Sequence, residues 1–260
     1  MSEDKVRLGG MALANGVLVH GPTAWACAVR TDEGELKVVA RRKRFSGAKV
    51  ESPLLRGPAR LADALSIVPQ ILRALPEARL PFQRKGVLAT MAASAVAVRF
   101  VRTSPKLGPA AQELMSGLLS VAPAALALRG DNVAAYHGAE HISIGSYEHD
   151  EPRAREHERC GSHLIGPLLV TSAAANAVAS TVPREYRGPA RAAASLGGLA
   201  AATELFGWMV RNPERPLAKA LAKPGHELQH RYATKEPTPE QVEVAEAALH
   251  ACLGLEAARA

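Results

Sequence analysis

The chain has 260 residues, of which 47% are hydrophobic and 22% charged, and its formal net charge is +7. This length allows one large domain or two small ones with a substantial core, and the apolar fraction excludes a wholly disordered chain. The three cysteines are too few and too scattered for a disulfide framework, which indicates a reducing, cytoplasmic location. Residues 1–5 lack the apolar core of a signal peptide, so we expect no export.

The first fifty residues have the pattern of β-strands. Short apolar runs at residues 11–13 and 16–20 lie between glycines. Residues 25–30 and 35–41 flank Thr31-Asp32-Glu33-Gly34, a turn signal, and therefore predict an antiparallel hairpin. The basic run Arg41-Arg42-Lys43-Arg44 has no interleaved aromatic residues, so it is more typical of a solvated loop than of a nucleic-acid contact.

After Pro58 the spacing of apolar residues becomes helical. Five of them share one face of a predicted helix with a kink at Pro69: Leu61, Leu65, Val68, Leu72 and Leu75. Further apolar helices are predicted at residues 86–101, 108–128, 164–180 and 191–211. Thr238-Pro239-Glu240-Gln241 has the order of a capping box before a last helix, residues 240–253, with Val242, Ala245, Leu249 and Cys252 turned inward.

These elements predict an α+β fold. A small N-terminal antiparallel β element, residues 1–50, would be followed by a mainly helical bundle, residues 51–260, in one continuous fold. Two segments are apolar enough to be considered as membrane-spanning helices. Residues 164–183 carry no charge and are long enough to cross a bilayer, but Pro167 and Asn176 weaken their transfer into lipid. Glu204 interrupts the apolar run 192–210, so we expect buried helices of a soluble protein.

The stretch Tyr136-His137-Gly138-Ala139-Glu140-His141 concentrates groups that can bind metals. On a helix, His137 and His141 would project from one face about 6 Å apart along the axis, within reach of one ion. The order His-x-x-Glu-His is the inverted form of a zinc-protease motif, in which the carboxylate acts as a base. The alternative interpretation is that they are two histidines on the surface or at the edge of the core.

A metal site needs at least one more ligand. Glu148 lies seven residues beyond His141, about 10 Å along a continuous helix, which is too far for the same ion. His157 and Cys160 could come from the following loop, and Glu204 from a later helix. The alternatives are that Glu204 pairs with Arg191 or Arg211, and that Cys160 is a small buried apolar residue.

Motifs over most of the chain resemble the bacterial YqhQ-like family, a group of unknown function described as predicted metal-dependent enzymes. They are Gly9-Gly10, Gly16-Val17, Gly21-Pro22, Trp25, Ala28-Val29-Arg30, Leu55-Arg56-Gly57, the 136–141 stretch, Tyr147-Glu148, His157, Arg159-Cys160-Gly161, Pro224-Gly225, Leu228-Gln229 and Thr234-Lys235-Glu236-Pro237. The chain departs from the family at Asn15, Ile142, Ser162-His163 and Thr203-Glu204. The resemblance implies a functional centre around residues 136–161. Many relatives also carry membrane spans in the middle of the chain and after the Cys-Gly motif, which implies membrane attachment, although the corresponding segments here are shorter and less apolar.

The functional prediction is a metal-dependent hydrolase of unknown small-molecule or peptide substrate. His137 and His141 would hold a divalent metal, with zinc favoured, and Cys160, Glu204 or His157 would complete its ligands. Glu140 would take a proton from the metal-bound water. Tyr147, Glu148 and Arg159 would support these residues.

The alternative is a non-catalytic binding protein. In it, His137, His141, His157 and Cys160 would form a closed structural metal site. Its basic surface would meet an anionic partner, either a nucleic acid or a membrane surface. Peripheral association with the inner membrane would follow from the same resemblance.

Overall fold

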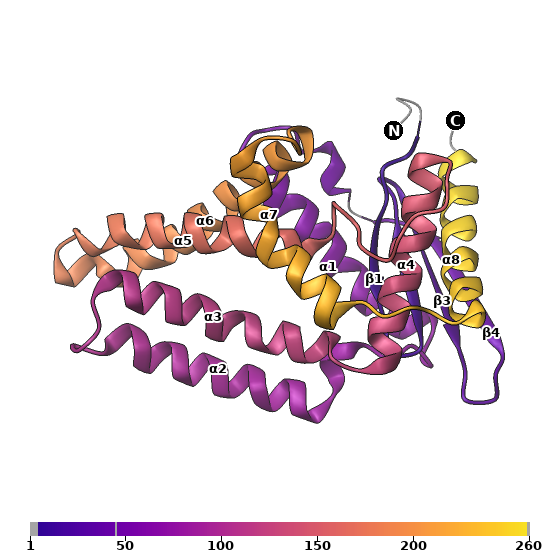
Figure 1. Ribbon diagram of the computed structural model, residues 1–260, viewed down its shortest axis with the longest axis horizontal. Coiled ribbons are helices and arrows are strands. Elements are labelled where there is room, and N and C mark those ends of the chain that lie inside the picture. Colours follow the sequence, from indigo (N-terminus) through magenta and orange to yellow (C-terminus); the bar gives the residue numbers. More distant parts are fainter. Residues whose placement is uncertain (1–4, 45, 259–260) are drawn as a thin grey trace.

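The computed structural model describes residues 5–44 and 46–258 (Figure 1). Residues 1–4, from which we mainly argued that the protein is not exported, lie outside the described residues. The first elements are the strands β1 (Gly9–Ala12), β2 (Gly16–His20), β3 (Ala24–Arg30) and β4 (Leu36–Arg42). The helices are α1 (Arg56–Ala74), α2 (Lys85–Thr103), α3 (Pro109–Leu128), α4 (Asp131–His149), α5 (Ile165–Ser180), α6 (Arg187–Arg211), α7 (Pro216–Leu228) and α8 (Pro239–Ala257). The predicted α+β fold is confirmed.

The four strands form an antiparallel sheet in the order β1-β2-β3-β4. Gly34, at φ +83°, makes the predicted turn between β3 and β4, where a side chain would be strained. The two central strands are buried on both faces, because alternate side chains point to opposite sides of a strand. Each face therefore needs its own helical cover.

One face of the sheet is covered by α1. Leu18, Trp25 and Val29 of the sheet pack with Ile67 and Ile71 of the helix. The predicted apolar face of this helix was partly wrong, since Leu61 is 43% exposed and Leu65 is 61% exposed. The helix packs instead through the face that carries Ile67 and Ile71, because that face meets the sheet.

The other face of the sheet is covered by α4 and α8 (Figure 1). Val17, Val19 and Ala28 of the sheet pack there with Ala139 of α4 and Ala248 of α8. Thr238 and Gln241 form the predicted capping box at the start of α8, and the Thr238 amide donates to Gln241 Oε1 at 2.9 Å. The first and last elements of the chain thus share one core. We call the unit of β1–β4, α1, α4 and α8 the body.

Helices α2, α3, α5 and α6 extend away from the body as two hairpins, and we call them the projecting helices (Figure 1). Four stretches are long and apolar enough to cross a membrane: Lys85–Thr103, Ala111–Leu128, Gly161–Ser180 and Arg187–Arg211. Only 11% to 28% of the residues in them are buried by the protein. The expected burial of the helices at residues 164–180 and 191–211 was therefore wrong, since most of their residues are not covered by the protein.

Candidate metal centre

Helix α4 places two histidines side by side within the body. His137 and His141 are one turn apart, and their ring centroids are separated by 4.2 Å. The helix runs without a break through Gly145 to His149, so Glu148 stays about 10 Å along the axis from His141. Both side chains are buried, at 7% and 2% exposure, so their ring nitrogens need partners inside the protein.

Backbone carbonyl groups orient both imidazoles. His137 Nδ1 lies 2.8 Å from the Ala233 oxygen, and His141 Nδ1 lies 2.6 Å from the Arg155 oxygen. A carbonyl oxygen can only accept, so each Nδ1 carries the proton and each Nε2 of the neutral ring keeps a lone pair. Metal-binding histidines are commonly oriented in this way. Burial, and then the neighbouring His137, hold the pKa of His141 well below its usual range, which favours the neutral form that binds metals.

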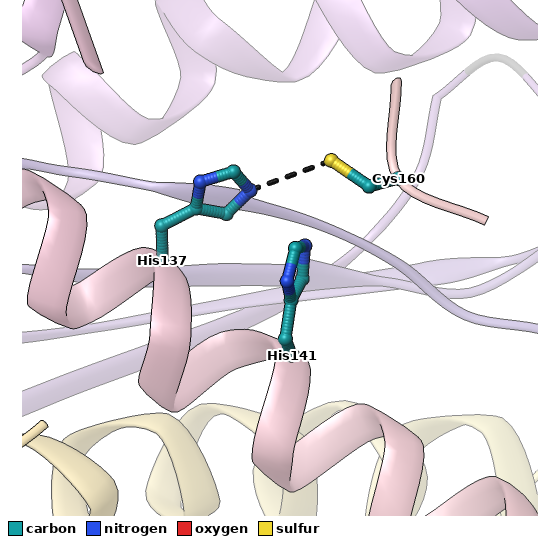
Figure 2. Close-up of side chains that lie close together, drawn as sticks. All are labelled: His137, His141 and Cys160. Atoms are coloured by element: carbon teal, nitrogen blue, oxygen red, sulfur yellow. Dashed lines mark hydrogen bonds between the residues drawn. The ribbon is translucent and has the colours of Figure 1, made fainter. Parts of the chain in front are cut away.

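Cys160 supplies the third donor from the loop that returns from α4. Its Sγ lies 3.5 Å from His137 Nε2 (Figure 2). Burial raises the pKa of the Cys160 thiol, and hydrogen bonds from Ser162 oppose that effect. A bound cation would favour the thiolate in this buried place, because metal ligation deprotonates the thiol.

Within the part of the chain that the structure describes, His137, His141 and Cys160 form a group that could hold a metal ion. One donor atom from each lies within 4.8 Å of the other two. Figure 2 shows both rings and the thiol turned toward one another from two segments of the chain. Two nitrogens and one sulfur are a donor set that suits zinc.

Glu140 lies beside this group. Its Oε2 is 3.6 Å from His141 Nε2, and the residue is only 6% exposed. Burial raises the pKa of its carboxyl, and the nearby His137 and His157 oppose that shift. Gly10 of β1 leaves room for this carboxylate, since a Cβ at that position would meet Glu140 Oε1 at 2.2 Å. The sheet therefore helps to position Glu140.

Glu148, His157 and Arg159 form a separate polar cluster next to the donors. Glu148 is 2% exposed and pairs with Arg159, and its Oε2 lies 3.1 Å from His157 Nε2. The Arg159 amide donates to His157 Nδ1 at 3.3 Å. Both ring nitrogens of His157 are thus engaged outside the donor group, although its ring centroid is 5.5 Å from that of His141.

Two other predicted site residues lie away from the donors. The Glu204 carboxylate accepts from Arg56, with Nε at 2.7 Å from Oε1, so the predicted ion pair exists but with a different arginine. The Tyr147 hydroxyl accepts from the Val6 amide at 3.1 Å, and its ring lies under Lys5. Tyr147 therefore holds the N-terminal segment against α4.

Sequence reasoning did not identify the segment that supports the site from the C-terminal half. Gln229–Ala233 form a π-helical turn, which is rare and occurs often at functional sites. This turn contributes the Ala233 carbonyl that orients His137. Gln229 is fully buried, and its Oε1 accepts from the His157 amide at 2.9 Å. The only sequence signal was the Leu228-Gln229 pair in the family resemblance.

Two of the three donors open onto a cavity of about 860 Å³ between the body and the projecting helices. His137 and Cys160 lie in its wall, and the rest of the wall comes mainly from α2, α3 and α5. Among the described residues that line it, none is Asp, Glu, Lys or Arg. Polar side chains other than His137 and Cys160 are limited to Ser94, Ser120 and Ser162.

A second cavity, of about 650 Å³, lies near the cluster of Glu148 and His157. Its chemistry is different, because five arginines contribute to its wall: Arg7, Arg60, Arg153, Arg159 and Arg211. Helix α6 borders it through Phe206 and Val210. Positive charge thus gathers where the body meets a projecting helix.

Comparison with known proteins adds one match. Residues 129–255 match the family described as "Protein of unknown function (DUF1385)". The matched region runs through α4, the 150–164 loop and most of α8, and it includes all three donors and Glu140. Neither the curated proteins nor the solved structures contain a match. The family has no assigned activity, so the reaction must be argued from the site itself.

Proposed function

We propose that the protein is a metal-dependent hydrolase whose metal is held by His137, His141 and Cys160. The observation that supports this most is the meeting of three donor atoms within 4.8 Å, with both histidine Nε2 lone pairs made available by backbone acceptors. Zinc is the expected ion, because catalytic zinc sites combine three protein ligands, often His or Cys, with one open position.

Glu140 is the proposed general base. A metal of this kind lowers the pKa of its bound water to about 7, so that hydroxide is available at neutral pH. Glu140 lies next to the donors, and a buried carboxyl with a raised pKa binds a proton more readily than an exposed one. The carboxylate would accept the proton of the water and return it to the leaving group.

The structure favours an open site over the closed structural site of the alternative hypothesis. A closed site of four protein ligands would need His157, whose two ring nitrogens contact Glu148 and the Arg159 amide. Glu140 Oε2 lies 3.6 Å from His141 Nε2, so a small movement could make it a fourth ligand. Replacement of Glu140 therefore distinguishes a base from a ligand.

The decisive experiment measures the metal content of the purified protein and its variants by elemental analysis. We expect about one zinc per chain, lost in His137→Ala and in Cys160→Ser and retained in His250→Ala, an exposed histidine of α8. Glu140→Gln should keep the metal if Glu140 is a base and lose it if Glu140 is a ligand. Protein without stoichiometric metal, or His137→Ala with unchanged metal, would refute the proposal.

We also propose that the projecting helices cross a bilayer, with the body on the cytoplasmic side. Their length and apolar character support this, since about 20 apolar residues span the hydrocarbon core. One ionisable pair connects two of these helices, and pairing of this kind lowers the cost of charge inside a membrane. Glu113 Oε2 accepts from Asn176 at 3.0 Å and lies 3.5 Å from Arg102. Protein released from membranes by carbonate without detergent would contradict insertion.

The anionic partner expected from the net charge is proposed to be a lipid headgroup in the arginine-lined cavity. Basic clusters that border a membrane helix attract anionic headgroups. This cavity is such a cluster, because its arginines lie beside α6. Detergent-purified protein should retain phosphorus-containing lipid, and Arg7→Ala with Arg60→Ala should lower that content at least twofold. An unchanged lipid phosphorus content would contradict this partner.

A further inference from the structure

The cavity beside the candidate metal centre has features that identify what could enter it. Its wall is mainly apolar, and His137 and Cys160 are part of it. Resting on the hydrolase proposed above, we propose that the substrate is a lipid acyl ester whose hydrocarbon chain occupies this cavity. Its ester group would lie at the His137 and Cys160 end.

The absence of polar partners decides between a lipid chain and a peptide. A peptide in the cavity would bring an N–H and a C=O with every residue, and burying each of them without a partner is unfavourable. Along the wall the described side chains offer few donors or acceptors, namely three serines besides the histidine and the cysteine. A hydrocarbon chain needs no partners, so it matches this wall and a peptide does not.

The position of the cavity gives the hydrocarbon chain of the lipid a route of entry. Its walls include Met91 and Val98 of α2, Ala124 of α3 and Leu168 of α5. These are helices whose outer residues, such as Phe100 at 71% and Leu118 at 59% exposure, are proposed to face lipid. A volume of about 860 Å³ is within the usual range for ligand sites, about 300–1,000 Å³. An acyl chain could therefore enter sideways from the bilayer without crossing water.

The reaction would be ester hydrolysis. The oxygen of water forms a bond to the acyl carbon, and the bond from that carbon to the alcohol oxygen breaks. One proton of the water passes to Glu140 and then to the departing alcohol oxygen. The products are a fatty acid and the free alcohol, and no oxidant or other reactant is consumed.

Two alanines of α3 provide a matched test. Ala124 lines the cavity, whereas Ala122 does not, and both are exposed positions of the same helix. The Ala124→Phe change should fill part of the cavity and leave the three metal donors in place. The control, Ala122→Phe, adds a side chain of the same size to α3 outside the cavity. Elemental analysis of each sample shows whether the metal site is intact.

The first measurement is photolabelling in detergent micelles with a phosphatidylcholine that carries a diazirine at the end of one acyl chain. We expect label on cavity residues such as Met91, located by mass spectrometry and displaced by unlabelled phosphatidylcholine. Ala124→Phe should reduce it at least fivefold, and Ala122→Phe should leave it unchanged. Label spread evenly over the outer faces of the helices, with equal yields in both variants, would overturn the proposal.

The second measurement is the hydrolysis of 4-nitrophenyl esters with acyl chains of two to sixteen carbons by the zinc-loaded protein. Each buried methylene contributes about 0.8 kcal/mol, so kcat/KM should rise about fourfold per methylene until the cavity is filled. Ala124→Phe should flatten this rise. A zinc-containing protein with no chain-length dependence would overturn the lipid substrate alone, whereas a metal-free protein would overturn the hydrolase proposal itself.

Discussion

The body and the projecting helices contain similar apolar residues but leave them in different surroundings. In the body, Trp25, Ile67 and Ile71 are fully buried between the sheet and α1. In the projecting helices, Phe100 and Leu196 are each 71% exposed. Exposed apolar surface of this extent is typical of a region that contacts a membrane or another protein, and the membrane is the contact proposed above. The comparison thus separates apolar residues that stabilise the fold from apolar residues that would hold the protein in a membrane.

The largest expected effect comes from charging the outer faces of the projecting helices. A lysine at the bilayer centre costs about 2.5–3.5 kcal/mol, so Leu118→Lys with Leu196→Lys should greatly reduce insertion. The measurement is the fraction of protein that stays with membranes after a carbonate wash. Leu65→Lys, on the exposed side of α1 at 61% exposure, is the matched control and should stay in the membrane fraction. Equal retention of both variants would show that the exposed faces do not meet lipid.

A smaller effect is expected from shortening an apolar side chain in either region. Ile71→Ala should destabilise the body by about 2–5 kcal/mol, because it leaves a cavity between α1 and the sheet. Leu118→Ala should change the stability by less than about 0.5 kcal/mol, since detergent or lipid replaces the lost contacts. Thermal unfolding in detergent compares the two. Similar losses in both variants would mean that α3 is packed against protein.

This comparison also explains which parts of the fold could be predicted from the sequence. The β3–β4 hairpin and the capping box of α8 depend on residues next to one another, Thr31 to Gly34 and Thr238 to Gln241, so they were predictable. The surroundings of the projecting helices could not be predicted in this way. An apolar helix that is covered by protein and one that is left exposed can have the same composition, and Pro167 and Asn176 do not distinguish the two.

The candidate site was predictable only where spacing along one helix determines it. His137 and His141 follow from the helical repeat, and the same repeat places Glu148 too far along α4 to share their ion. The Arg56 partner of Glu204 lies 148 positions away in the sequence, and the carbonyls that orient the histidines belong to Arg155 and Ala233. These contacts arise from tertiary packing, which the spacing of residues does not encode.

A titration of the body gives the next prediction. Burial, and then the neighbouring Lys43, lower the pKa of His20 to about 4, and Asp63 partly opposes the shift. The unfolded chain therefore binds this proton at pH 6.5, and the folded chain binds it only near pH 4. The stabilisation is fully present above pH 6.5 and is lost as the pH falls from 6.5 toward 4. The loss should reach up to about 3 kcal/mol, since one pKa unit corresponds to about 1.4 kcal/mol.

The measurement is the unfolding free energy between pH 7 and pH 4 for the protein and for His20→Asn. The variant should lose less stability over this range, because it has no imidazole to protonate. Control measurements with His250→Ala, at an exposed histidine of α8, should follow the unmodified protein. Parallel curves for all three proteins would show that His20 does not titrate as its surroundings require.

The smallest effect, about 1–2 kcal/mol, is expected where the sheet meets the candidate metal centre. Gly10→Ala would place a Cβ 2.2 Å from Glu140 Oε1, so the carboxylate or the strand must move. In the Glu140→Ala background that conflict is removed, and the same change should cost much less. Gly86→Ala in α2, where a Cβ meets nothing within 4 Å, should stabilise the helix slightly in both backgrounds.

A double-mutant cycle on unfolding free energies would measure this coupling between Gly10 and Glu140. A coupling of about 1 kcal/mol or more would show that β1 confines the carboxylate next to the donors. Retained zinc in Gly10→Ala, together with reduced hydrolysis, would then assign the loss to the position of Glu140. A coupling near zero would mean that the carboxylate moves freely, and that the body holds the donor atoms without determining where the proposed base lies.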